Sequence, residues 1–151
     1  MLGQIHLYVW LGTCDLTTRD KSGYISITTN PFNTLDHIIG KYREIANIIA
    51  NYPGSKVTFL EVPVYSIVTY NSTRDHLDSQ KFTTQETDLL ETIHELNPRG
   101  QELNKELGNI SPSFNRSLYT KHRTHDKQDT IIRYIFIQMV FILLHCCLGC
   151  G

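Results

Sequence analysis

The chain has 151 residues and a formal net charge of −1, so it can form one domain and has no overall charge that attracts nucleic acid or anionic lipid. Hydrophobic residues make up 40% and charged residues 19%, which excludes an intrinsically disordered chain. Cys14 stands alone and the other three cysteines crowd the last six residues, unlike a disulfide framework. The first residues also lack the features of a secretion signal. We therefore expect a cytoplasmic protein with reduced cysteines.

The first half of the chain predicts a strand, a helix and a second strand. Ile5 to Leu11 is a short apolar run ending at Gly12, which predicts a mostly buried strand, and the polar stretch from Thr13 to Asn30 predicts a long loop or a loop with a hairpin. Apolar residues at helical spacing follow: Leu35, Ile38, Ile39, Tyr42, Ile45, Ala46 and Ile49.

The predicted helix has Asn33 or Thr34 as N-cap and ends near Tyr52, before Pro53-Gly54. Lys56 to Val62 predicts a second strand closed by proline. Strand, helix and strand with short connections indicate a βαβ unit with parallel strands.

A second helical pattern follows a Tyr/Ser/Asn-rich loop. Thr83 and Glu86 predict a capping box, and one apolar face continues through Leu89, Leu90, Ile93 and Leu96. The run from Asn97 to Gly100 contains a proline, so we expect it to break or kink this helix, at a cost of ~3 kcal/mol. Ser111 to Leu118 predicts a third short strand.

The predicted fold is therefore α/β, a partial three-layer parallel sheet of about three strands. We assign residues 1–134 to one domain and residues 135–151 to an apolar, cysteine-rich tail. An edge of so small a sheet stays unpaired, so we expect the protein to self-associate.

The order of these elements resembles the SGNH (GDSL-type) hydrolases, in which a strand ends in a G-x-N-D motif. The matching segment is Gly12-Thr13-Cys14-Asp15, and the run from Val57 to Pro63 supports the likeness. The sequence looks most similar to SGNH-like domains found beside invertebrate retroelement proteins, over about residues 5–134. The resemblance implies a flavodoxin-like fold and a serine esterase or acyl hydrolase that needs no cofactor.

The same resemblance implies that Gly12, Cys14 and Asp15 form the oxyanion loop. In the family the motif's asparagine donates to the oxyanion, a contribution of roughly 3–4 kcal/mol, whereas Cys14 offers only a weak donor. The sequence contains neither the family's Gly-Asp-Ser block nor its D-x-x-H block. Because nucleophile and base act as a unit, we expect a degenerate, inactive fragment with no intact catalytic residue.

A change of reading frame near Tyr134 to Ile137 would explain the missing D-x-x-H block. Read from the third base of the Ile137 codon, the codons that follow permit Thr-Asp-Gly-apolar-His-Pro, and the codons of His145, Cys146 and Cys147 force two leucines. A Gln138 codon ending in A would give Asn in place of Asp and contradict the hypothesis. In this interpretation the tail is out of frame.

Other functions stay open from the sequence. The main rival is a small protein bound to a membrane through residues 131–148, although that run is short for a spanning helix, which needs about 20 residues. Another is a non-catalytic binding module. Cys147 and Cys150 form one isolated CxxC, the seven histidines form no metal-ligand pattern, and Lys121 to Lys127 is a weak nucleic-acid footprint. We therefore expect no metal or cofactor, and the sequence names no partner.

Overall fold

The computed structural model describes residues 5–29 and 31–112. The chain divides into two compact units, Met1–Ser113 and Phe114–Gly151, and the described residues all belong to the first. The predicted basic loop, the apolar tail with its CxxC, and the predicted strand beyond Pro112 lie outside the described residues. The described part is mixed α/β, with one small parallel and one small antiparallel sheet.

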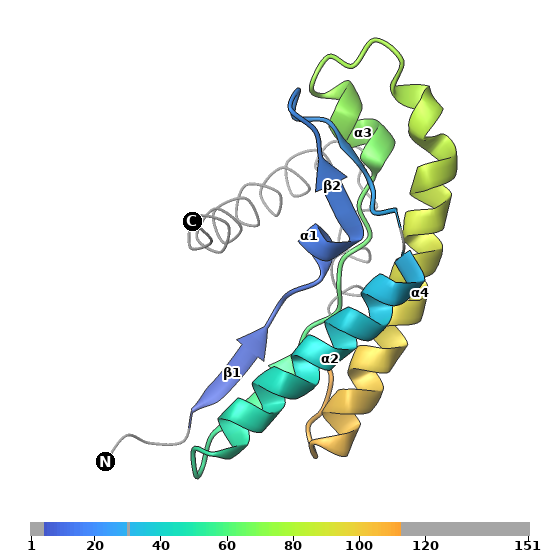
Figure 1. Ribbon diagram of the computed structural model, residues 1–151. Coiled ribbons are helices and arrows are strands. Elements are labelled where there is room, and N and C mark those ends of the chain that lie inside the picture. The colour runs from blue at the N-terminus through green and yellow to red at the C-terminus, as the bar shows by residue number, and fades with distance from the viewer. Residues whose placement is uncertain (1–4, 30, 113–151) are drawn as a thin grey trace, which may run out of the picture. The chain divides into compact units, whose positions relative to one another are not determined.

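The predicted βαβ unit is confirmed. Strand β1 (His6–Val9) pairs in parallel with strand β4 (Lys56–Phe59), and Leu7 lies opposite Val57. Helix α2 (Pro31–Ala50) connects them and lies along the strands (Figure 1). The Tyr42 ring of α2 stacks on Phe59, with the ring centroids 4.4 Å apart. Helix α2 therefore covers the sheet face that carries Phe59.

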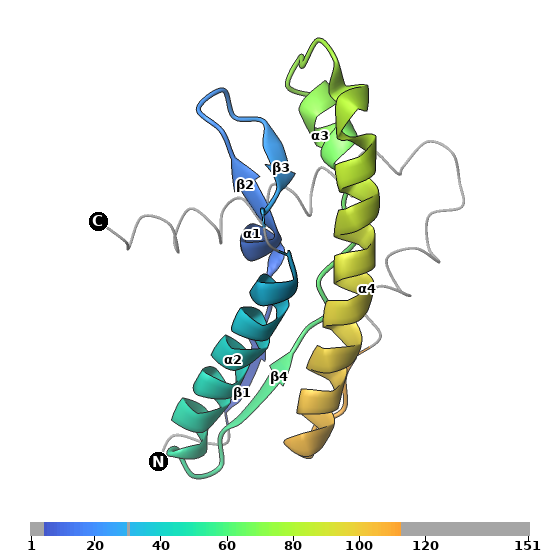
Figure 2. The same cartoon turned by 45° about the vertical axis from the view of Figure 1, so that its right-hand side comes forward.

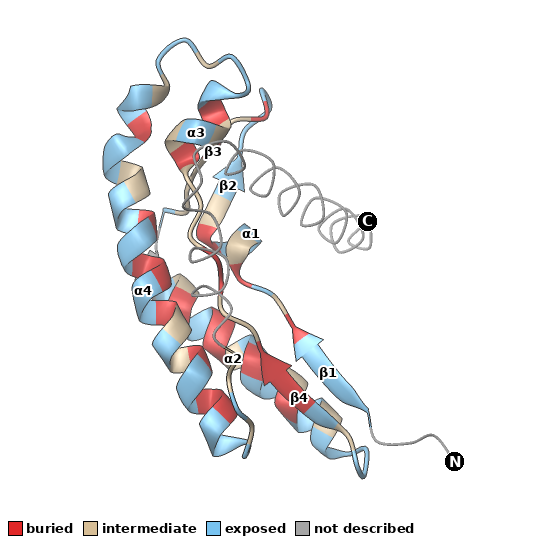
Figure 3. Ribbon diagram, turned by 180° about the vertical axis from the view of Figure 1, so that it is seen from behind, coloured by how far each residue is buried: buried red, intermediate tan, exposed pale blue. Residues whose placement is uncertain are grey.

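A second long helix, α4 (Thr83–Glu106), packs against both α2 and β4. Its buried apolar residues Leu89, Ile93, Leu96 and Leu103 join the core formed with α2 and β4. In Figure 3 the buried residues of this core appear as red segments of the α2, α4 and β4 ribbons. The core thus lies between two helices and one face of the parallel sheet.

The segment between β1 and α2 contains a hairpin, which was one of the two predicted alternatives. After the short helix α1 (Thr13–Leu16), strands β2 (Thr17–Arg19) and β3 (Ile25–Ile27) pair antiparallel (Figure 2). The predicted Tyr/Ser/Asn-rich loop holds helix α3 (Ile67–Ser72) and a 3-10 turn, η1 (Ser79–Phe82), neither of which we predicted.

The prediction that the first strand is mostly buried is wrong. Three of the four β1 residues are exposed and only Val9 is buried. The apolar composition of the run is typical of a central parallel strand, but within the described residues β1 pairs on one side only. Burial of a strand depends on its neighbours, which its own composition does not encode.

Three predicted details of the helices are also wrong. Helix α2 starts at Pro31, so Asn33 and Thr34 lie inside its first turn. Helix α4 continues through Pro98 to Glu106, so of the predicted break or kink the break is wrong. Glu86 does not close a capping box at Thr83: its carboxylate accepts from the backbone N–H of Val68 at 2.8 Å and so caps α3 instead.

Three asparagine side chains hold the backbone at sheet edges; we call Asn71, Asn97 and Asn104 the edge asparagines. Each accepts from the backbone N–H of one residue and donates to the C=O of the same residue: Asn71 to Ile25, Asn97 to Val62 and Asn104 to Phe59, all at 2.8–2.9 Å. An amide side chain can do this because it carries both a donor and an acceptor. The edge asparagines thus replace a neighbouring strand.

Candidate functional site

The loop that the sequence singled out lies at the carboxyl ends of the two parallel strands. Gly12 follows β1 and adopts φ 116°, and its C=O accepts from the backbone N–H of Leu16 at 3.1 Å, which starts α1. A Cβ at Gly12 would lie 3.0 Å from Val62 Cγ2 and 3.4 Å from Leu96 Cδ2. Both the positive φ and the close packing therefore require glycine here.

Two tyrosines fix the loop from the core side. The Tyr42 hydroxyl donates to the Leu11 C=O at 2.6 Å, and the Tyr65 hydroxyl donates to the Thr13 C=O at 3.1 Å. Burial, and secondarily the charge of Asp15, raises the pKa of Tyr42 above its usual value. Burial also raises the pKa of Tyr65, against the lowering effect of its hydrogen bond with Thr17. Both hydroxyls therefore stay protonated donors at neutral pH.

Cys14 and Asp15 lie on the outer side of this turn, and both are exposed. The turn places them where α/β proteins with parallel sheets bind ligands, beyond the carboxyl ends of the strands. The backbone geometry of the predicted oxyanion loop is thus present, whereas its chemistry is limited to one thiol, one carboxylate and the local N–H groups. The role of these residues in an oxyanion loop stays a prediction.

Ser66 is the hydroxyl that follows β4 at the same end of the sheet. It donates to Glu86 Oε2 at 2.6 Å and accepts from the backbone N–H of Thr69 at 2.9 Å, so it is the N-cap of α3. Among the described residues no serine hydroxyl bonds to a histidine. The His6 ring nitrogen Nε2 bonds instead to Thr58 Oγ1 at 2.8 Å, and His76 Nδ1 accepts from the backbone N–H of Asp78. The serine–histidine pair of a serine esterase is therefore not found in this part of the chain.

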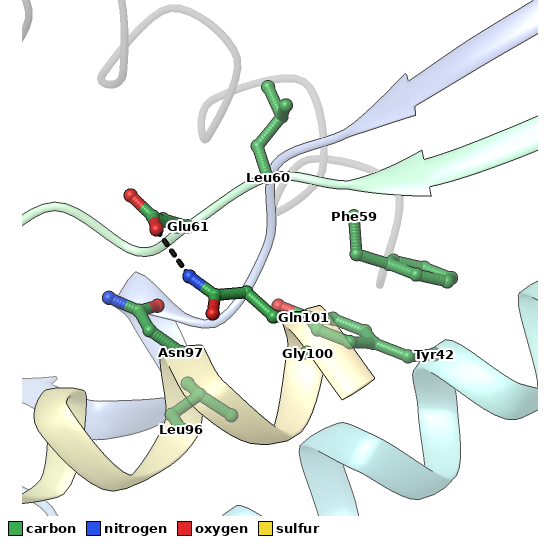
Figure 4. A pocket seen from close by; sticks show the side chains of 8 residues that line it. All are labelled: Tyr42, Phe59, Leu60, Glu61, Leu96, Asn97, Gly100 and Gln101. Atoms are coloured by element: carbon green, nitrogen blue, oxygen red, sulfur yellow. Dashed lines mark hydrogen bonds between the residues drawn. The ribbon is translucent and has the colours of Figure 1, made fainter. Parts of the chain in front are cut away.

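A small cavity lies under the loop, between α2, β4 and α4 (Figure 4). Its volume is about 10 Å³, which is enough for roughly one water molecule. Glu61 and Gln101 meet at its rim, where the Gln101 amide donates to the carboxylate at 2.6 Å. This cavity cannot hold an acyl ester.

A larger hollow of about 720 Å³ lies between β3 and α4, and none of the residues that line it belongs to the Gly12 loop. It is lined by Ser26, Ile27, Thr28, Thr29, Gln85, Asp88, Glu91, Thr92 and Glu95. Its titratable residues are all carboxylates, so it lacks a positive group for an anionic substrate and a histidine for acid–base chemistry.

In residues 5–29 and 31–112, no three histidine, cysteine or carboxylate side chains gather as metal ligands would. Within the same ranges, no helix combines the length and the apolar character that crossing a bilayer requires.

The comparisons with known proteins add no further assignment. No protein-family model matches this sequence, and neither a curated protein nor a solved structure shows significant similarity to it.

Proposed function

We propose that this chain carries part of an SGNH hydrolase-like domain that has lost ester hydrolysis. In the intact members, further strands would flank β1 in a flavodoxin-like, three-layer domain; the proposal is that this chain carries only part of such a sheet and is cytoplasmic. Its site consists of Gly12, Cys14 and Asp15. The intact members it resembles are serine esterases or acyl hydrolases without a cofactor.

The observation that carries the proposal is the geometry of the Gly12 turn. A glycine at φ 116° leads from a parallel strand directly into a short helix, and the turn packs against Val62 beyond the end of the adjacent strand. This is the position that the resemblance predicts for the oxyanion loop, and it is the usual ligand end of a parallel sheet.

The loss of activity follows from what surrounds that turn. Cys14 stands in place of the asparagine that would donate to the oxyanion. Ser66, the serine that follows the adjacent strand, caps helix α3 and donates to the Glu86 carboxylate, and it has no hydrogen bond to any histidine that the structure describes. Without the histidine that takes its proton in a serine esterase, a serine hydroxyl is a poor nucleophile.

Inactivity can be tested with two probes on the full chain: a chromogenic short-chain acyl ester and a fluorophosphonate, which labels activated serines. We expect neither turnover nor labelling above that of the Cys14→Ala and Asp15→Ala variants, beside a serine esterase as positive control. Labelling of any serine, or turnover that falls in these variants, would contradict the proposal.

Membership of the family needs a separate test, because many proteins hydrolyse no ester. The coding DNA provides it. We expect a Gln138 codon ending in G. We also expect a codon run for Gly-Asp-Ser within ~300 bases upstream, where the family's first strand would be encoded. A Gln138 codon ending in A would contradict the frame hypothesis, and an upstream region without the run would contradict the assignment of a truncated domain.

A further inference from the structure

The outer edge of β1 is the open edge of the described parallel sheet. Ile5, Leu7 and Tyr8 are 52%, 39% and 57% exposed there, although their residue types favour burial in a sheet. We propose that a second copy of this chain occupies this edge, with β1 pairing antiparallel to β1 of the partner about a two-fold axis at Leu7. This inference does not depend on the proposed loss of esterase activity.

The ladder between β1 and β4 determines which backbone groups face outward. The backbone N–H of Lys56 donates to the Ile5 C=O and that of Leu60 donates to the Val9 C=O, both at 2.8 Å. In a parallel pair, alternate residues of one strand make all its bonds to the neighbour. Ile5, Leu7 and Val9 therefore turn their backbone groups to β4, and His6 and Tyr8 turn theirs to the open edge.

Two outward residues separated by one inward residue make a self-complementary edge. With the axis at Leu7, His6 lies opposite the partner's Tyr8, and Tyr8 lies opposite the partner's His6. In antiparallel strands each such pair exchanges both N–H···O=C bonds. All four outward N–H and C=O groups of His6 and Tyr8 on each copy are then satisfied, and this register uses only residues within β1.

The side chains fit the same register. Leu7 lies opposite Val57, and Val9 opposite Phe59, so Leu7 is on the sheet face that α2 covers. At the axis Leu7 meets the partner's Leu7 in a non-hydrogen-bonded pair, the closer kind of cross-strand contact. On the other face the His6 and Tyr8 rings already stack, with their centroids 4.5 Å apart, so each copy presents a flat aromatic pair beside the axis.

The outer edges of β4 and β3 are less suited to a partner strand than that of β1. The edge asparagines Asn97 and Asn104 occupy the outer edge of β4 and its extension, and Asn109 donates to the Val57 C=O at 2.7 Å. On β3, Asn71 and Gln85 accept from the backbone N–H groups of Ile25 and Ile27. A strand added to β4 or β3 would have to displace these amides.

A charge-swap experiment tests the inference on the full chain. We expect the native protein to sediment as a dimer and Leu7→Lys and Leu7→Glu each to weaken self-association at least about tenfold, because like charges meet at the axis. An equimolar mixture of the two variants should restore a dimer, since Lys then faces Glu. A monomeric native protein would overturn the inference. Self-association that Leu7→Lys leaves unchanged would also overturn it, because the copies would then associate through another segment.

Cross-linking tests the register. In a background with Cys14, Cys146, Cys147 and Cys150 replaced by serine, Leu7→Cys should form an intermolecular disulfide on mild oxidation, because its Cα would lie about 4.5 Å from the partner's. Tyr8→Cys is the matched control: its Cα lies about 7–8 Å from the partner's copy of the same residue, so it should cross-link much more slowly. Equal or faster cross-linking through Tyr8→Cys would overturn the register.

Discussion

The two edges of the parallel sheet differ in what binds their outward backbone groups. On the β4 side, Asn104 is fully buried and holds both backbone groups of Phe59, and it also donates to Ser111 Oγ at 2.8 Å. On the β1 side, the outward groups belong to His6 and Tyr8 in an exposed strand. At an edge closed by side chains, the backbone hydrogen bonds depend on single residues. At an open edge the residues can be replaced more freely, but their backbone groups can bind another strand.

Loss of the amide at the closed edge should have the largest effect. We expect Asn104→Ala to destabilise the fold by about 3–5 kcal/mol, because the buried N–H and C=O of Phe59 lose their partners at ~1–3 kcal/mol each. Urea unfolding measures this change. Ser111→Ala is the control, since it removes only the third bond of the amide and should cost less than about 1 kcal/mol. A similar small loss for both variants would mean that the closed edge does not depend on Asn104.

The turn between the two strand ends should be the next most sensitive place. We expect Gly12→Ala to cost about 2 kcal/mol, because φ 116° is strained for alanine and its Cβ would lie 3.0 Å from Val62 Cγ2. Gly40→Ala in α2 is a matched control: its Cβ meets no atom within 4 Å, so it should stabilise the helix by roughly 0.5–1 kcal/mol. Thermal or urea unfolding distinguishes the two, and equal signs would contradict the prediction.

The tyrosines that bond to this turn predict that the protein loses stability at alkaline pH. Folding raises the pKa of both Tyr42 and Tyr65 above the unfolded value of about 10, so above that pH the unfolded state loses protons that the native state keeps. Stability should therefore be unaffected below about pH 10 and fall as pH rises, by about 1 kcal/mol per tyrosine at pH 11.

Absorbance of tyrosinate during an alkaline titration measures this behaviour. Tyr42 and Tyr65 should ionise only together with unfolding. In Tyr42→Phe one late-ionising group should disappear. If a change from tyrosine to phenylalanine at position 42 or 65 removes no late-ionising group, the prediction is wrong.

Substitution at the open edge should have the smallest effect on the folded protomer. At a protein concentration below that of self-association, we expect Leu7→Thr to change stability by less than about 1 kcal/mol, since Leu7 is 39% exposed. Val9→Thr is its control on the same sheet face; Val9 is 9% exposed and packs in the core, so it should cost more. Equal losses would show that the two positions are equally packed.

The βαβ unit could be predicted because its signals are local. The spacing of Leu35, Ile38 and Tyr42 indicates a helix without reference to the rest of the chain, and all three are buried in the core. The turn at Gly12 was located for a similar reason, since a glycine closes the apolar run. Predicted ends were less accurate: β4 ends at Phe59, three residues before the predicted limit.

The edge asparagines could not be predicted from local signals. Asn97 beside Pro98 has the composition of a helix end, but its amide is held by Val62, 35 residues away along the chain. Glu86 likewise has a better partner at Val68 than at the start of its own helix. A weak signal did exist: Asn97 and Asn104 are seven residues apart, two helical turns, next to the apolar face of α4, where asparagine is otherwise unfavourable.

The edge asparagines also make the fold sensitive to slow hydrolysis of their side-chain amides. Asparagine is thermolabile, and hydrolysis of its amide gives a carboxylate, which accepts hydrogen bonds but cannot donate them. At Asn71, Asn97 or Asn104 that reaction would set a negative oxygen against the carbonyl that the amide now serves. Hydrolysis of one side-chain amide would thus remove the hydrogen bonds that hold a backbone segment. Storage at high temperature and alkaline pH should therefore disrupt the closed edge before the open one.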